Sequence, residues 1–306
     1  MQTTIRSAAT FHGVGLHTGE RVRMTVRPAS ANYGIWFRRT DVIGKNAMVP
    51  AMWDAVTPSR LCTVVENAVG VSVSTVEHIM AALSGCGVHN ALIEINGPEV
   101  PILDGSAQPF VAAILGRGLR DLDVPVRCFE ILETVEVREG EAVARLEPAR
   151  ALEIDFAIDF DDRAIGQQRK VLSMANGAFV RELSDCRTFC RQSDVDAMRA
   201  SGLALGGTYD NAVVVEGDHI LSPGGFRRDD EAVRHKMLDA LGDLALAGAP
   251  ILGRYTGNRA GHAMTNRLLR ALFARPEAFR MTECDAARRR ILPGAGVRQT
   301  DIPAVA

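Results

Sequence analysis

The stretch VRHKMLDALGD, residues 233–243, predicts a helix with two unlike sides. At about 100° per residue, its polar groups His235, Lys236, Asp239 and Asp243 fall into one narrow wedge. The opposite side carries only apolar residues, which are Val233, Met237, Ala240, Leu241 and Leu244. The apolar side of such a helix is expected to pack against a hydrophobic core, and the four polar groups on the other side raise the question of which ligand or partner they bind.

Composition limits the classes of protein to which the chain can belong. Its 306 residues suffice for roughly two domains of about 150 residues each. With 47% hydrophobic and 24% charged residues, it is typical of a folded globular protein. A net charge of −2 gives no general attraction for nucleic acid or an anionic membrane, so neither partner is expected.

The beginning of the chain predicts a cytoplasmic enzyme or binding protein, and the cysteines predict thiols rather than a disulfide scaffold. The amino terminus shows no apolar run typical of a secretory signal, and no stretch is long enough to cross a bilayer. The six cysteines include no CxxC pair and are too few for a disulfide scaffold, so most are expected to be buried thiols.

Alternating and helical patterns predict an α+β fold. Strands are expected at RVRMTVRPA, GIWFRR and NALIEI, and helices at STVEHIMAAL and AQPFVAAILGRGL. After residues 119–127 the same order returns: strands in ETVEVREGEAVARLEP and LEIDFAIDF, a helix over 230–247, one strand at PILGRY and a last helix from GHAMTN. We therefore expect domains over 1–123 and 128–300.

Residues 191–221 interrupt this order with a short helix and the glycine-bearing GLALGG. Two interpretations remain open for this insertion. It either faces a substrate, because functional residues concentrate on such segments, or is a surface excursion.

A metal site is the first chemical hypothesis. His235 and Asp239 lie one helical turn apart, which forms half of a site, although exposed pairs of this kind are common and contribute only tenths of a kcal/mol. His78 is either an ordinary helix residue or a third ligand. Two histidines and one carboxylate leave a fourth position for water, as catalytic zinc requires.

Two further groups are candidates for proton transfer. Glu77 would lie beside the metal and its water, but it also completes a possible capping box with Ser74. His262, at the start of the last helix, would donate a proton if Asp243 stabilised its charge, or would be an ordinary helix-start histidine.

Two lesser candidates keep two interpretations each. His17 in GLHTG either lines the site or is held by turn backbone. Cys62 in RLCT either faces the metal, where it would bind a second, inhibitory ion, or is a buried inert thiol.

Several long motifs add a family resemblance over nearly the whole chain. The chain resembles the UDP-3-O-acyl-N-acetylglucosamine deacetylases, zinc hydrolases that catalyse the committed step of lipid A synthesis in Gram-negative bacteria. The motifs occur in order as FHGVGLHTGE, SRLCT, STVEHIMAAL, GPEVPILDGSAQPF, DCRTF, GLALGG, VRHKMLDALGDLALAG and GHAMTNRLL.

The resemblance implies two similar α+β domains, each a sheet with paired helices, with the helices sandwiched between two outer sheets and the active site at the junction. It also implies one catalytic Zn²⁺, with Fe²⁺ as the alternative. The implied metal ligands are His78, His235 and Asp239. The implied catalytic groups are Glu77 as base, His262 as acid, Asp243 as the carboxylate that orients the acid, and Thr188 as the hydroxyl at the oxyanion.

The implied substrate is a UDP-linked, acylated amino sugar. Lys236 would lie near its phosphates, and Phe160 and Phe189 near its body. The insertion would form an apolar passage for the acyl chain, with Leu203, Ala204 and Leu205 in it. A monomer is expected. The alternatives left open are a binding protein that has lost turnover and a zinc hydrolase of a different amide.

Overall fold

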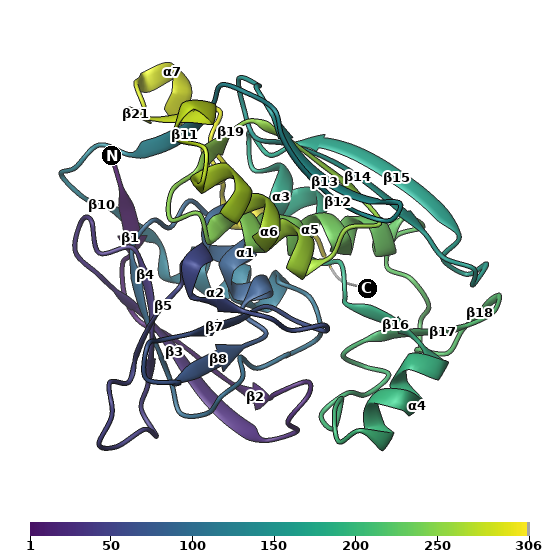
Figure 1. Ribbon diagram of the computed structural model, residues 1–306. Helices are drawn as coiled ribbons and strands as arrows, with labels where there is room; N and C mark the ends of the chain where they lie inside the picture. The colour runs from purple at the N-terminus through teal and green to yellow at the C-terminus, as the bar shows by residue number, and fades with distance from the viewer. Residues whose placement is uncertain (305–306) are drawn as a thin grey trace.

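The computed structural model describes residues 1–304, and its architecture is α+β as predicted. Two five-stranded sheets form the outer layers, and the main helices lie between them (Figure 1). The first sheet has the order β2 (Ala9–Val14), β3 (Arg21–Pro28), β9 (Ala91–Ile95), β4 (Ile35–Arg39) and β5 (Met48–Pro50). The second has the order β12 (Val135–Glu139), β13 (Ala142–Glu147), β20 (Arg254–Asn258), β14 (Glu153–Asp159) and β15 (Gln167–Ser173).

The two sheets have the same topology. In each, only the third and fourth strands are parallel, β9 with β4 and β20 with β14, and all other neighbours are antiparallel. In each, the third strand of the sheet follows a helix in the chain, since β9 follows α1 (Glu77–Gly85) and β20 comes after α5 (Glu231–Ala245). The two halves are therefore structural repeats, as the family resemblance implied, although the sequence contains no repeated motif. The chain division at 123–128 stays a prediction.

Alternation explains the strands. In β3, Val22, Met24 and Val26 are buried while Arg21 and Arg23 are exposed, as the sequence pattern predicted. The apolar sides of both sheets meet the helices α1, α2 (Gln108–Arg117), α5 and α6 (His262–Phe273), and one continuous hydrophobic core results. A short helix, α3 (Ala178–Glu182), also buries apolar side chains in it.

Helices α1 and α5 come into backbone contact. Gly242 of α5 faces the backbone of Glu77, and a Cβ atom at residue 242 would overlap the Glu77 carbonyl oxygen. Because only glycine permits this approach, the beginning of α1 lies directly against the last two turns of α5. This crossing brings residues from the two halves of the chain to one place.

Smaller elements surround the two sheets. Near the start of α1 lies a sheet of β6 (Val56–Thr57), β7 (Val64–Glu66) and β8 (Ser72–Ser74). A second small sheet joins β11 (Arg127–Ile131), β19 (Ile251–Leu252) and β21 (Phe279–Glu283), and β1 (Thr3–Ile5) pairs with β10 (Leu119–Asp121). The chain also has α7 (Ala286–Arg289) and short 3-10 turns at Trp53–Ala55, Pro276–Ala278 and Gln299–Asp301.

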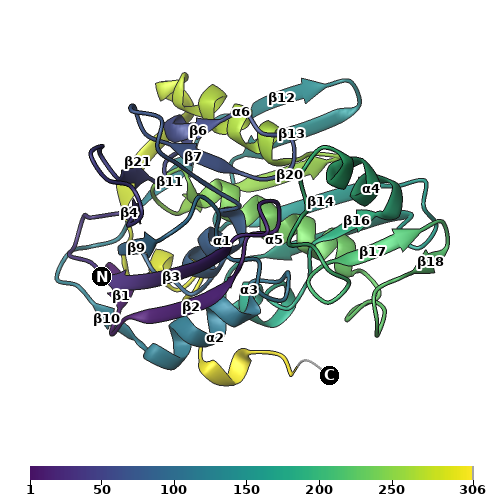
Figure 2. The same ribbon diagram turned by 90° about the horizontal axis from the view of Figure 1, so that it is seen from below.

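The predicted insertion forms a separate lobe. It contains α4 (Gln192–Ala200) and a sheet of β16 (Phe189–Arg191), β17 (Val213–Glu216) and β18 (His219–Ile220). Both Figure 1 and Figure 2 show this lobe projecting to one side of the two large sheets. Its position next to the ends of both sheets leaves it close to the crossing of α1 and α5.

One strand prediction was wrong. PILGRY was expected as a single strand, but it divides at Gly253 into β19 and β20, which belong to different sheets. Gly253 packs against Ile131, where a Cβ atom would lie 2.7 Å from the Ile131 Cγ1 atom. This close contact accompanies the change of sheet, which alternation of apolar residues does not reveal. None of the helices within residues 1–304 has the length and apolar character needed to cross a bilayer.

Candidate active site

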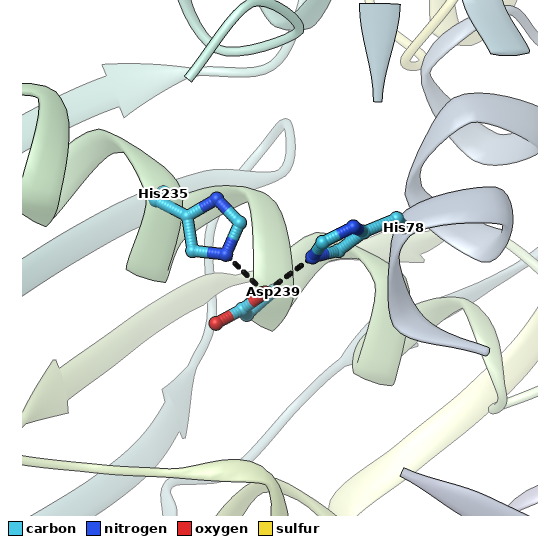
Figure 3. Close-up of side chains that lie close together, drawn as sticks. All are labelled: His78, His235 and Asp239. Atoms are coloured by element: carbon cyan, nitrogen blue, oxygen red, sulfur yellow. Dashed lines mark ion pairs between the residues drawn. The ribbon is translucent and has the colours of Figure 1, made fainter. Parts of the chain in front are cut away.

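Three potential metal ligands converge where α1 crosses α5. His78 is the second residue of α1, and His235 and Asp239 lie one turn apart on α5 (Figure 3). The Asp239 Oδ1 atom is 3.2 Å from His235 Nε2 and 3.7 Å from His78 Nε2, and one ligand atom from each residue lies within 4.8 Å of the others. All three side chains are buried, so the interpretation of residues 235 and 239 as an exposed helix pair was wrong.

The orientation of the two imidazoles suits a divalent cation. The Nδ1 atom of His235 lies 3.0 Å from the Cys186 carbonyl oxygen, which only accepts, so Nδ1–H donates to it and Nε2 is the nitrogen that faces Asp239. Burial, and then the neighbouring His235, lower the pKa of His78 to about 3 and keep this imidazole neutral. The Nε2 atoms of both imidazoles therefore face one carboxylate.

Asp239 supplies the negative charge of the group. Burial opposes its ionisation, but His235 and Lys236 outweigh burial and hold its pKa well below the usual range. Lys236 Nζ donates to Oδ2 at 2.7 Å, whereas the buried Oδ1 has no hydrogen-bond partner within residues 1–304. A buried carboxylate oxygen without a donor is costly unless a cation binds it, so the group fits a metal ion.

Glu77 occupies the first position of α1, beside the ligand group. Its Oε2 atom accepts a hydrogen bond from the Thr63 backbone N–H at 3.0 Å, and its Oε1 atom lies 3.9 Å from His262 Nε2. Burial raises the pKa of Glu77 to about 7, although the charge of His262 opposes this rise. The carboxylate therefore takes up and releases protons near neutral pH.

The alternative role of Glu77 in a capping box was wrong. Helix α1 begins after Val76 without any side-chain cap, and the Ser74 hydroxyl donates to the Pro98 carbonyl at 3.1 Å instead. The Glu77 carboxylate therefore points away from Ser74, with Oε2 held by the Thr63 N–H and Oε1 on the side of His262.

His262 and Asp243 form a pair on α6 and α5. His262 is the first residue of α6, and its Nδ1 atom lies 2.9 Å from Asp243 Oδ2. Burial lowers the pKa of His262, but Asp243 and Glu77 outweigh it and raise the pKa to about 9. The imidazole is therefore protonated at neutral pH, and its Nε2 atom is 3.9 Å from both Glu77 Oε1 and Asp239 Oδ2.

A cavity of about 840 Å³ extends from these groups into the insertion. The predicted residues Thr188 and Lys236 line it, and Phe160 and Phe189 pack edge to face in it with ring centroids 5.5 Å apart. Of the three apolar residues expected in the passage, Ala204 lines the cavity, whereas Leu203 and Leu205 are 38% and 58% exposed. Val195, Ala197 and Met198 of α4 supply more of the apolar wall.

Comparison with known proteins identifies the family. The model of the family described as UDP-3-O-acyl N-acetylglycosamine deacetylase matches residues 2–274. The chain belongs to this deacetylase family. The curated UDP-3-O-acyl-N-acetylglucosamine deacetylase of Phenylobacterium zucineum (strain HLK1) is 52% identical over 280 residues, which cover 92% of this chain and 96% of that protein.

Two relatives of the same name extend the match. The protein of Shewanella frigidimarina (strain NCIMB 400) is 40% identical over 300 residues, covering 96% of this chain and 98% of the relative. That of Shewanella woodyi (strain ATCC 51908 / MS32) is 42% identical over 282 residues, covering 92% of each chain. Members of the deacetylase family are enzymes, and the resemblance inferred from the motifs is confirmed.

Two lesser candidates take different places in this deacetylase-family fold. His17 lines the cavity, which supports the interpretation that it faces the site. Cys62 is buried, and its Sγ atom lies 3.8 Å from the Ser59 hydroxyl. Burial, with a contribution from Glu77, raises the pKa of Cys62 to about 11, so a protonated and inert thiol is favoured over a metal ligand.

Sequence patterns missed two supporting residues of this site, Thr63 and Arg187. The Thr63 hydroxyl donates to Asp243 Oδ1 at 2.6 Å, so one residue holds both Asp243 and Glu77. The buried Arg187 donates from its backbone N–H and from Nε to Glu231 Oε1, at 2.9 and 3.0 Å, and thereby fixes the segment containing Thr188. Both residues lie inside motifs of the deacetylase family, SRLCT and DCRTF, which were the only signal available.

Proposed function

We propose that this chain is a zinc-dependent hydrolase that removes the N-acetyl group from UDP-3-O-(3-hydroxyacyl)-N-acetylglucosamine and releases acetate, the committed step of lipid A biosynthesis. One observation carries the proposal: His78, His235 and Asp239 converge beside Glu77 and His262 in a single buried site. Its relatives with high coverage carry the name of this deacetylase.

The metal ligands in this proposal are His78, His235 and Asp239. Three protein ligands are the number that leaves an open position in a catalytic zinc site. A divalent ion bound there supplies Lewis acidity and lowers the pKa of water. Fe²⁺ accepts the same nitrogen and oxygen donors, so it is the alternative metal.

Glu77 acts as the general base in this scheme. The Thr63 N–H holds its Oε2 atom, which leaves Oε1 on the side of His262 and the ligand group. A base is most effective when its pKa lies near the working pH, and burial gives Glu77 a pKa of about 7. Glu77 therefore takes the proton of the attacking water.

His262 acts as the general acid. Its imidazolium carries a proton on Nε2 toward the space between Glu77 and Asp239, while Nδ1 donates to Asp243. Nε2 gives this proton to the departing amine, and Asp243 orients the ring and stabilises its charge. The Thr188 hydroxyl, which lines the same cavity, donates to the oxyanion that forms on the acetyl carbonyl.

Substrate binding uses the rest of the cavity. Lys236 places a cation beside Asp239, where it would meet a phosphate of the nucleotide. The Phe160–Phe189 pair would contact the body of the substrate, and the apolar wall of α4 would contact its acyl chain. A monomer of two domains, 1–123 and 128–300, would hold all of these groups in one chain.

Metal content measured together with acetate release tests this function. We expect about one zinc ion per chain, loss of turnover on chelation, and recovery when zinc is added back. His12→Ala, which changes an exposed histidine of β2, serves as the control and keeps both metal and activity. Acetate release by fully metal-free protein, or no release by the zinc-loaded protein, would contradict the proposal.

A further inference from the structure

Glu99 takes no part in the reaction described above, yet each oxygen of its buried carboxylate accepts two hydrogen bonds. The residue is 1% exposed and lies in the segment between β9 and α2. Its Oε1 atom accepts from the His17 backbone N–H at 2.9 Å and from the Thr75 hydroxyl at 3.0 Å. Its Oε2 atom accepts from the Thr18 backbone N–H and hydroxyl, both at 2.8 Å.

These four hydrogen bonds replace an ion pair. No lysine or arginine within residues 1–304 forms a salt bridge with Glu99. A buried carboxylate stabilised only by hydrogen bonds demands all of its donors, because the loss of one leaves charge without compensation. The donors come from two segments far apart in the sequence, so the carboxylate fixes one segment to the other.

The first segment leads into α1. Thr75 has φ +57°, a left-handed conformation that is unfavourable for a β-branched residue, and it comes two residues before Glu77. Backbone hydrogen bonds from Ser74 N to Pro98 O and from Val100 N to Ser74 O also hold this segment next to Glu99. Because α1 packs against α5 in the core, the segment that leads into α1 is held in place by the core. Glu99 therefore joins the turn at residues 17 and 18 to a rigid part of the fold.

The second segment is the turn of residues 15–19. Gly15 lies against Glu99, and a Cβ atom there would overlap the Glu99 Oε2 atom. The outer side of the turn meets the insertion: the Leu16 carbonyl accepts from Gly206 N at 3.0 Å, and the His17 carbonyl accepts from Leu205 N at 3.2 Å. Gly206 packs so closely on the Gly15 carbonyl that no side chain fits.

Together, this turn and the loop of residues 204–207 form a cavity wall. Leu16 and His17 from the turn line the 840 Å³ cavity, and so do Ala204 and Gly207 from the insertion. The position of the loop 204–207 depends on that of the turn 15–19, because backbone carbonyls of the turn accept hydrogen bonds from backbone N–H groups of the loop. Glu99 is thus the only group on the α1 side of the turn that accepts from the backbone N–H groups of His17 and Thr18 within the described chain.

We propose that Glu99 is a positioning residue that sets this cavity wall, the turn 15–19 with the loop 204–207, relative to helix α1. Its carboxylate prearranges the wall against which a long substrate packs, and it leaves the metal ligands and Glu77 untouched. The choice of acylated substrate in the kinetic test rests on the proposed function, whereas the exchange test below does not.

Backbone hydrogen exchange measures the coupling directly. Glu99→Gln keeps the shape but replaces one acceptor oxygen by an NH2 donor, so the backbone N–H of His17 or Thr18 on that side loses its acceptor, whereas the threonine hydroxyl on the same side accepts from the new amide. In the variant, compared with the wild-type protein purified in the same way, we expect the amides of His17, Thr18, Leu205 and Gly206 to exchange about tenfold faster or more. Faster exchange at residues 17 and 18 with unchanged exchange at residues 205 and 206 would overturn the proposed coupling.

The matched control is Glu94→Gln. Glu94 lies on β9, close in sequence, but its carboxylate pairs with Arg27 and Arg38 at the surface. This variant should leave the exchange of both segments unchanged. Equal acceleration in the two variants would assign the effect to general loss of stability and would overturn the specific role of Glu99.

Kinetics and metal affinity separate positioning from a plain structural role. For Glu99→Gln we expect KM for the UDP-linked acylated substrate to rise about tenfold, because the displaced cavity wall binds the substrate less well. We expect kcat and zinc affinity to stay within about threefold of the wild type, because the groups that contact the transition state are unchanged. Thr18→Val removes a single donor hydroxyl and should give the same pattern with a smaller rise, which preserves the test if Glu99→Gln does not fold. A fall in kcat without a rise in KM would contradict the proposal. Inactivity of the wild-type protein would contradict the proposed function alone.

Discussion

The Oδ2 atom of Asp243 lies 2.9 Å from Nδ1 of His262, and the other oxygen of the same carboxylate accepts the Thr63 hydroxyl at 2.6 Å. Thr63 also holds Glu77 through its backbone N–H. The proposed acid and the proposed base are therefore oriented by one shared residue from the β6–β8 region, so their relative position depends on a part of the chain that takes no direct part in proton transfer.

Asp243→Asn should lower the pKa of His262. In the metal-free wild-type protein, Asp243 and Glu77 outweigh burial and raise that pKa to about 9, so removal of one carboxylate moves the titration toward lower pH. The measurement is an NMR titration of the imidazole signals in metal-free protein. Asp41→Asn, at the surface next to Arg39, is the control and should leave the His262 titration unchanged. An unshifted His262 in Asp243→Asn would refute this electrostatic account.

The same pair predicts a pH dependence of stability. Because the pKa of His262 is raised in the folded state, its contribution to the free energy of unfolding is complete below pH 6.5 and is lost as the pH rises through about 9. Denaturant unfolding of metal-free wild-type protein and of His262→Ala should therefore differ more at pH 6 than at pH 10. A difference that grows toward high pH would have the wrong sign.

Glu77→Gln should keep the metal but lose two or more decades of rate, in line with the contribution of a general base. The amide keeps the size of the side chain and has no proton-accepting carboxylate, so the loss reports chemistry rather than packing. Acetate release and zinc content are measured on the same preparation. Retained turnover would show that another group removes the proton from water.

The sequence predicted the part of the site that follows from local geometry. Helical periodicity alone placed His235, Asp239 and Asp243 on one side of α5, since spacing along a helix depends only on neighbouring residues. It could not show whether that side was buried, because burial depends on α1 and the insertion, which come from distant segments. Thr63 was missed for the same reason: it lies 180 residues from Asp243, and only the fold brings them together.

No repeated sequence motif revealed the shared topology, which only the order of the predicted elements and the family resemblance indicated. The two large sheets share one strand order, but each position needs only an apolar residue facing the helices, and many residue types satisfy this. The motifs that gave the family resemblance pointed to individual site residues, whereas periodicity gave only the side of a helix. The motifs do so because they contain residue types, such as histidine and aspartate, that the proposed chemistry requires. The roles of Thr188, Lys236, Phe160 and Phe189, the cytoplasmic location and the monomeric state stay predictions.

His78→Ala should lose metal binding. The substitution removes the only ligand of the group that α1 supplies, and two ligands from one helix turn remain on α5. We expect the zinc affinity to fall by at least 100-fold, measured by competition with a chelator of known affinity. The His12→Ala control keeps the affinity of the wild type. Full zinc occupancy in His78→Ala at low free zinc would contradict the ligand assignment.

Gly242→Ala should destabilise the protein and displace the start of α1. A Cβ atom at this position would overlap the Glu77 carbonyl oxygen, and the two helices must separate to admit it, at a cost of about 1–3 kcal/mol in the free energy of unfolding. Denaturant unfolding measures this cost.

Gly116→Ala on α2 is the matched control, because a Cβ atom there meets only Gln299 Nε2 at 3.9 Å and alanine in an exposed helix adds about 0.5–1 kcal/mol of stability. Since the Glu77 and His78 side chains follow that backbone, zinc affinity should fall in Gly242→Ala and stay constant in Gly116→Ala. Unchanged stability and zinc affinity in Gly242→Ala would mean that the close approach of α1 and α5 does not set the geometry of the site.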